Sequence, residues 1–161
     1  MTKLLRALLV EDSEIDAHLL VRELQNSGYV VEYERVETRA AMQQSLSSRV
    51  WDVILCDYSL PQFNAVNALT VLKESGIDIP FVVISGTIQE EAAVAVLRAG
   101  AHDFIVKGRF ARLAPAIDRE IRDAEIRRSH RTVKEKQAEL TADLETISAD
   151  LERFLYTAFH E

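Results

Sequence analysis

The apolar residues in the first part of this chain gather in five short runs, and each run is followed by a segment with helical spacing. The runs cover residues 4–10, 29–36, 53–57, 79–84 and 101–106. A run that is apolar on both faces, such as Val53 to Cys56, is typical of a central strand in a parallel sheet covered by helices. The run at 29–36 alternates apolar and polar residues, which predicts a half-exposed strand near a sheet edge.

Capping residues mark where the helices between these runs should begin. Four polar side chains are expected to accept a backbone N–H of the first helical turn, namely Ser13, Thr38, Asn64 and Thr87. Their helices should run to about Asn26, Ser48, Gly76 and Gly100. Thr87 and Glu90 also match a capping box. A fifth helix is expected to begin near Arg112, because Pro115 is tolerated in a first turn.

Strand followed by helix, five times over, predicts an α/β fold class. We expect a five-stranded parallel sheet, doubly wound, with helices on both faces and right-handed crossovers. Helical spacing also predicts which side chains face the sheet. For the first helix these are Ile15, Leu19, Val21 and Leu24, and for the fourth they are Ala92, Ala93, Val96 and Leu97.

The last helix should be longer than the others, because no glycine or proline follows Pro115. We expect one globular domain over residues 1–123 and a helical tail over residues 124–161. Tail residues at alternating spacings of four and three form a heptad. One seam position holds Ile126, Val133, Leu140, Ile147 and Phe154, and the other holds His130, Gln137, Leu144, Leu151 and Ala158. A single helix of about 70 Å cannot bury such a seam, so a parallel homodimeric coiled coil is expected.

Composition and charge narrow the function classes. The formal net charge of −7 argues against nucleic acid or an anionic membrane as the main partner. The single cysteine, Cys56, excludes an internal disulfide and a cysteine-based zinc site. Apolar runs fall short of a membrane span, and the N-terminus does not match a secretory signal, so we expect a cytoplasmic chain with no membrane contact.

Three acids are expected to meet where the strands end: Glu11, Asp12 and Asp57. Carboxylates so close together repel one another unless a cation lies between them. Oxygen ligands without histidine or cysteine favour a hard ion, most simply Mg²⁺, which prefers phosphoryl substrates. Lys107 and Ser85 follow two other strands and add an ammonium and a hydroxyl. Together these groups predict phosphoryl transfer onto Asp57.

The same residues, in this order, resemble the receiver domain of two-component signalling over residues 4–123. The matching positions are Glu11-Asp12, Asp57 with Leu60-Pro61, Ser85-Gly86-Thr87, and Phe104 with Lys107. The resemblance implies a flavodoxin-like fold and Asp57 as the phospho-acceptor, with a histidine kinase or a phosphotransfer protein as donor. It also implies that Asp12, Asp57 and the backbone carbonyl of Ser59 bind Mg²⁺, with Glu11 acting through water.

Three further roles are implied by the resemblance. Ser85 would bond the incoming phosphoryl group, Lys107 would pair with it, and Phe104 would be the aromatic whose rotation reports phosphorylation. The chain departs from the family pattern at Gln62 and Ala65, where glycines are usual, and at Gly108, where proline is usual. Simpler structural roles are a capping or turn aspartate for Asp57 and a core aromatic for Phe104.

The C-terminal sequence, with Phe154 six residues before His160-Glu161, resembles the start of the dimerisation and phosphotransfer helix of histidine kinases. That resemblance would make His160 a second phospho-acceptor. The alternative is an ordinary exposed histidine near a chain end. Because the chain stops within this pattern, we expect it to be a piece of a longer protein.

Three functions follow from these observations. The first is a receiver that regulates a histidine kinase through the continuous helix. The second is a stand-alone response regulator whose coiled coil binds a partner. The third, an aspartate-nucleophile phosphatase, needs a second acid two residues after the nucleophile, and Ser59 stands there instead.

Overall fold

The predicted parallel sheet is present in the computed structural model, which describes residues 2–87 and 90–160. Its five strands are β1 (Lys3–Val10), β2 (Tyr29–Val36), β3 (Val53–Asp57), β4 (Phe81–Ser85) and β5 (Asp103–Val106). They pair in the order β2-β1-β3-β4-β5, and every pairing is parallel. This arrangement confirms the α/β, doubly wound fold class and places β2 at an edge, as its alternating pattern predicted.

The helices follow the strands as predicted. They are α1 (Glu14–Asn26), α2 (Arg39–Ser48), α3 (Ala65–Ser75), α4 (Glu90–Ala99) and α5 (Leu113–Phe159), and a short 3₁₀ turn, η1 (Phe110–Arg112), precedes the last. The side chains of Ser13, Thr38 and Asn64 each accept a backbone N–H in the first turn of their helix, which confirms three caps. The turn assigned to Thr87 includes residues 88 and 89, which lie outside the described residues.

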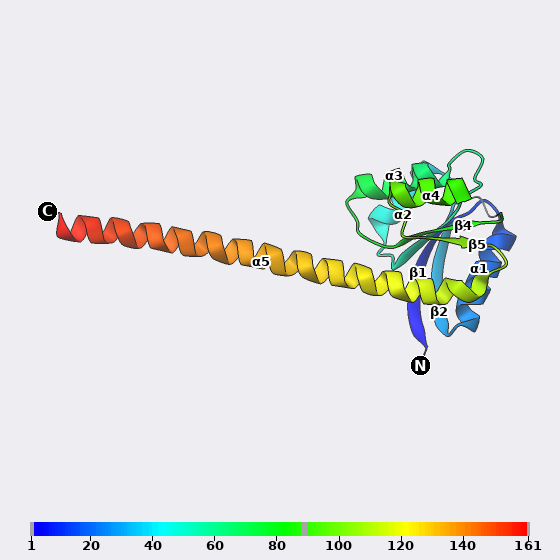
Figure 1. The fold of residues 1–161 in the computed structure, drawn as a ribbon, viewed down its shortest axis with the longest axis horizontal. Coiled ribbons are helices and arrows are strands. Elements are labelled where there is room, and N and C mark those ends of the chain that lie inside the picture. Colours follow the sequence, from blue (N-terminus) through cyan, green and yellow to red (C-terminus); the bar gives the residue numbers. More distant parts are fainter. Residues whose placement is uncertain (1, 88–89, 161) are drawn as a thin grey trace. The chain divides into compact units, whose positions relative to one another are not determined.

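Helices cover both faces of the sheet (Figure 1). On one face α2, α3 and α4 pack over β-strand side chains such as Ile54, Cys56 and Phe81. On the other face α1 and the first turns of α5 pack over Leu9, Leu55 and their neighbours. The five residues of β3 are all buried because both of their faces are covered. Cys56 lies within this strand and has no exposed surface.

Two sets of predicted inward-facing residues were wrong in part. In α1, Val21 and Leu24 are buried as predicted, but Ile15 and Leu19 are 73% and 49% exposed, and the helix buries Ala17 and Leu20 in their place. The four buried residues of α1 have the spacing of one helical stripe. In α4, Leu97 is 41% exposed while Val96 is buried.

The strands β4 and β5 begin at Phe81 and Asp103, each two residues later than predicted. Ile79 and Ala101 are nevertheless buried, at 4% and 8% exposure. The apolar runs therefore extend past the paired part of the strands, because the core continues beneath the loops that lead into the sheet.

By packing, the structure divides into two units, Met1–Ala124 and Glu125–Glu161. The second unit is helical as far as Phe159. Its apolar heptad residues are between 51% and 67% exposed: Ile126, Val133, Leu140, Leu144, Ile147, Leu151 and Phe154. No helix among residues 2–87 and 90–160 has the length and apolarity that a membrane crossing needs.

Candidate functional site

The strand order determines where the candidate site lies. β1 and β3 are neighbours, but the helix after β1 covers one face of the sheet and the helix after β3 covers the other. Side chains that follow these two strands therefore meet in the crevice between the diverging connections, which is where open α/β sheets bind ligands. Glu11 and Asp12 follow β1, and Asp57 is the last residue of β3.

The structure brings the three predicted acids together. One carboxylate oxygen of each of Glu11, Asp12 and Asp57 lies within 4.8 Å of the others. Glu11 and Asp57 are 1% and 7% exposed, whereas Asp12 faces solvent. Glu11 Oε1 accepts the Ser13 N–H at 3.1 Å. Its other oxygen, Oε2, is buried and accepts no hydrogen bond from the residues that the structure describes.

This environment makes Glu11 a weaker acid than an exposed glutamate. The pKa of Glu11 is raised to about 7, mainly because the group is buried. The charge of Asp57 and the side chain of Asp12 also raise this pKa, while the Ser13 N–H and the charge of Lys107 lower it. A buried carboxylate oxygen without a donor, beside two more carboxylates, is the kind of site that a hard divalent cation completes. The donor set, all oxygen, fits Mg²⁺ better than a soft metal.

The ammonium of Lys107 lies among three carboxylates. Its Nζ donates to Asp16 Oδ2 at 2.8 Å and lies 3.5 Å from Glu11 Oε2 and 3.7 Å from Asp57 Oδ1. Burial lowers the pKa of Lys107, but the hydrogen bond to Asp16 and the charges of Asp57 and Glu11 outweigh it, so the pKa rises. Lys107 is therefore a permanent cation beside Asp57.

Two serines adjoin these groups. Ser59 donates its backbone N–H to Asp57 Oδ1 at 3.3 Å, which fixes the carboxylate at the start of the following turn. Ser85 is fully buried at the end of β4, where its Oγ donates to the Thr87 carbonyl at 3.0 Å. The backbone N–H of Lys107 donates to the Ser85 carbonyl at 2.6 Å, so the ends of β4 and β5 are joined at the site.

Phe104 lies between the candidate site and the hydrophobic core under α2, α3 and α4. Its half-buried ring packs against the cluster under α2, α3 and α4. It meets Tyr58, the residue after Asp57, edge to face, with ring centroids 6.3 Å apart and an angle of 64° between the planes. The structural role expected of a core aromatic is therefore present, and Tyr58 links it to the site.

His160 lies in the second unit and is exposed. Its ring stacks on Tyr156 with centroids 4.2 Å apart, and its Nδ1 lies 3.0 Å from the Tyr156 carbonyl oxygen. With Nδ1 as the donor in that contact, Nε2 is the nitrogen that carries the lone pair.

Asp16 is the site residue that sequence reasoning missed. It lies three residues after Ser13, in the first turn of α1. From sequence, this spacing predicts only that a helix begins there. Which way its side chain points depends on how α1 crosses the sheet, and no motif in the sequence records that.

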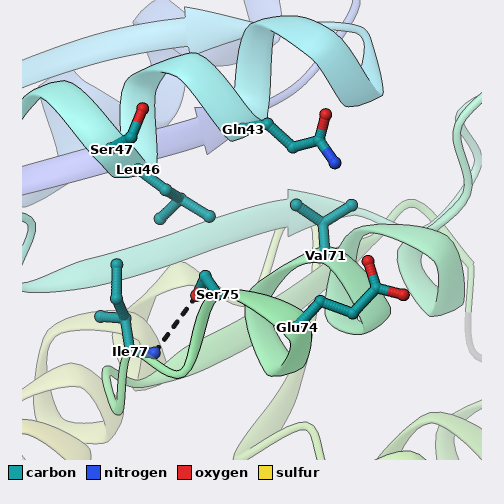
Figure 2. Close-up of a pocket in the computed structure, with 7 residues that line it drawn as sticks. All are labelled: Gln43, Leu46, Ser47, Val71, Glu74, Ser75 and Ile77. Carbon is teal, nitrogen blue, oxygen red and sulfur yellow. Dashed lines mark hydrogen bonds between the residues drawn. The ribbon is translucent and has the colours of Figure 1, made fainter.

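A separate cavity of about 360 Å³ lies between α2 and α3. Figure 2 shows its lining, in which Leu46, Val71 and Ile77 supply the apolar side chains and Ser75 Oγ accepts the Ile77 N–H at 3.2 Å. The predicted site residues do not line it.

Comparison with known proteins gives a consistent result. A family model described as the response regulator receiver domain matches residues 7–118. A protein-glutamate methylesterase/protein-glutamine glutaminase of Treponema denticola is 33% identical over 106 residues, 64% of this chain and 28% of that protein. The chemotaxis protein CheY of Thermotoga maritima is 26% identical over 102 residues, 63% of this chain and 84% of CheY.

The matches to longer proteins are partial. The transcriptional regulatory protein PrrA of Mycobacterium bovis is 32% identical over 102 residues, which cover 43% of its length. The chain thus spans less than half of the methylesterase and of PrrA. Among solved structures, FixJ-N has a TM-score of 0.64 at 27% identity, with 73% of this chain and 94% of that chain covered. The beryllofluoride-activated NtrC4 receiver domain dimer has a TM-score of 0.62 at 25% identity, with 74% and 98% covered.

Proposed function

Because this chain belongs to the response regulator receiver family of two-component phosphorelay signalling, we propose that Asp57 is its phospho-acceptor. The observation that carries the proposal is the surroundings of that carboxylate. Asp57 ends a fully buried strand, and Glu11, Asp12 and Lys107 lie around its oxygens. A helix-capping or turn aspartate does not need a half-buried lysine and two more acids beside it.

The reaction transfers a phosphoryl group from a phosphohistidine of a histidine kinase or phosphotransfer protein. An oxygen of Asp57 attacks the phosphorus, a P–O bond forms, and the P–N bond breaks with its electron pair left on the imidazole nitrogen. Lys107 is positioned to pair with the new phosphoryl oxygens, since its Nζ already lies 3.7 Å from Asp57 Oδ1. Ser85 would turn its hydroxyl from Thr87 to the phosphoryl group, and Phe104 would repack as it does so.

The residues that would hold Mg²⁺ are Asp12, Asp57 and the backbone carbonyl of Ser59, with Glu11 through a water molecule. Bound there, the ion supplies positive charge that offsets the negative charge of the phosphoryl group. The Oε2 of Glu11 supports this assignment, because a hydrated cation gives that oxygen the hydrogen-bond donor it lacks, beyond the Lys107 ammonium at 3.5 Å.

Phosphorylation is tested directly with acetyl phosphate and Mg²⁺, followed by intact-protein mass spectrometry. The wild-type chain should gain one phosphoryl group that is labile at alkaline pH, as an acyl phosphate is. Asp57→Asn should gain none. Asp143→Asn, which changes an exposed tail aspartate, is the matched control and should behave as wild type. Equal labelling of Asp57→Asn and wild type would refute the proposal.

The second part of the proposal concerns the tail. We assign residues 1–123 to the receiver domain and residues 124–161 to a coiled-coil signalling helix that forms a parallel homodimer and enters a histidine-kinase phosphotransfer helix. The exposed apolar heptad supports it, because a second copy would cover that seam. The accessible ring of His160 supports the kinase context, since a phospho-acceptor must be reached by its donor.

A stand-alone regulator whose coiled coil binds a partner is the competing assignment. Cysteines introduced at seam positions Leu144 and Leu151 would report the tail geometry by disulfide crosslinking, with and without beryllofluoride. Coupling between Asp57 and the kinase helix requires that beryllofluoride changes these crosslinking yields. Identical yields in both states would contradict it and favour a passive dimerisation tail.

A further inference from the structure

The side chain of Asp16 forms the shortest contact to the lysine of the site, yet it has no part in the proposed phosphoryl transfer. Lys107 Nζ lies 2.8 Å from Asp16 Oδ2, against 3.5 Å from Glu11 and 3.7 Å from Asp57. Only the contact to Asp16 is a hydrogen bond. In this structure Lys107 is therefore hydrogen-bonded to α1, while its contact with the phospho-acceptor is an ion pair at 3.7 Å.

The backbone of Asp16 is held firmly in place. Its N–H is capped by the Ser13 hydroxyl at 3.2 Å, and the neighbouring Ala17 and Leu20 are buried against the sheet. The Asp16 side chain is 37% exposed and Lys107 24%, so the pair lies at the rim of the crevice, outside the more deeply buried Asp57. Asp16 thus presents its carboxylate to Lys107 from a rigid first turn of α1.

A phosphoryl group on Asp57 changes what Lys107 faces. It brings up to two negative charges and three strong acceptor oxygens to a point within reach of the ammonium. Lys107 can then leave Asp16 or divide its hydrogen bonds between the two acids. Either change removes part of the Asp16 contact, so the free energy of that contact favours the unphosphorylated state.

We propose that Asp16 is a positioning residue that competes with phosphorylated Asp57 for Lys107 and so lowers the stability of the phosphorylated state. This inference rests on the proposed function of Asp57. As a consequence, the charge of Asp16, together with that of the metal-binding acids, sets what fraction of the receiver is phosphorylated at a given concentration of phospho-donor.

Beryllofluoride, which adds to an aspartate carboxylate as a phosphoryl mimic, provides a test at equilibrium. Its binding in saturating Mg²⁺ can be followed by the ¹⁹F NMR signal of the bound species. Asp16→Asn should bind about fivefold tighter than wild type, the factor expected for losing a competing, partly exposed ion pair. Asp16→Glu keeps the negative charge and should stay near wild type.

A double-mutant cycle separates competition for Lys107 from a general effect on α1. In a Lys107→Met background, Asp16→Asn should leave beryllofluoride affinity unchanged, because the group competed for is gone. Tighter binding that persists in that background, or equal tightening by Asp16→Glu, would overturn the proposal. Urea unfolding of each variant verifies that the domain is folded.

The outcomes also distinguish a failure of the role of Asp16 from a failure of the phospho-acceptor role of Asp57. If the wild-type chain shows no bound beryllofluoride, the phospho-acceptor role of Asp57 fails and the role of Asp16 fails with it. If the wild type binds and Asp57→Asn does not, but Asp16→Asn binds no tighter than wild type, the role of Asp16 alone is wrong.

Discussion

Replacing Glu11 by glutamine should make the receiver more stable at alkaline pH when Mg²⁺ is removed by a chelator. Glu11 is 1% exposed, and burial raises its pKa from 4.5 to about 7. A folded-state pKa above the unfolded value means that the folded protein prefers the protonated acid. The stabilisation from that preference is complete below about pH 4.5 and is lost as pH rises through about 7.

The magnitude follows from the two pKa values. A difference of about 2.5 pKa units corresponds to about 3 kcal/mol, most of which falls between about pH 5 and about pH 8. Between those two pH values the wild type should therefore lose about 2 to 3 kcal/mol more unfolding free energy than Glu11→Gln. The unfolding free energy of Glu11→Gln lacks this pH dependence because an amide does not ionise.

Urea unfolding followed by the fluorescence of Trp51 gives the measurement. Trp51 is the single tryptophan of the chain and is 4% exposed, so its emission changes when the core opens. Glu14→Gln is the matched control, since it removes an exposed acid at the start of α1, three residues after Glu11. Parallel pH profiles for wild type and Glu11→Gln would refute the reasoning, because burial of Glu11 would then carry no ionisation cost.

Three other predictions concern the metal, the core and the tail. Mg²⁺ at about a hundred times its dissociation constant should stabilise the wild type by about 2.7 kcal/mol in thermal unfolding, and Asp12→Asn should lose most of that gain. Phe81→Ala should cost about 3 to 5 kcal/mol in urea, because Phe81 is fully buried, whereas Phe154→Ala in the exposed tail should not change receiver stability. Basic residues dominate positions 127–136 and acids dominate 139–152, so a parallel dimer sets like charges side by side. Raising NaCl from about 50 mM to about 500 mM should tighten dimerisation in sedimentation equilibrium, and weakening would contradict parallel pairing.

The strands and the main site could be predicted from sequence because parallel topology leaves few alternatives. Once β3 is recognised as a buried strand, Asp57 must stand at its carboxyl end, and Glu11 and Lys107 must stand at the same edge. The N-caps Ser13, Thr38 and Asn64 could be predicted for a similar reason, since a cap depends only on residues within one turn.

What could not be predicted depends on packing between elements. In α1 the apolar residues form two adjacent stripes, and the shape of the sheet surface buries the stripe with Ala17 and Leu20 while Ile15 stays exposed. The same choice of helix rotation turns Asp16 toward Lys107, which is 91 positions later in the chain. No periodicity or motif in the sequence predicts a contact between residues so far apart in the chain.

The buried thiol of Cys56 provides a reporter for the motions of the strand that carries Asp57. Burial raises the pKa of this thiol, and no part of the residue is exposed, so alkylating reagents can modify it only after β3 opens to solvent. Under native conditions the labelling rate at Cys56 therefore measures how often that strand opens, as amide exchange does for a backbone group. A ligand that closes the crevice next to Cys56 should slow the labelling, even though it never touches the sulfur.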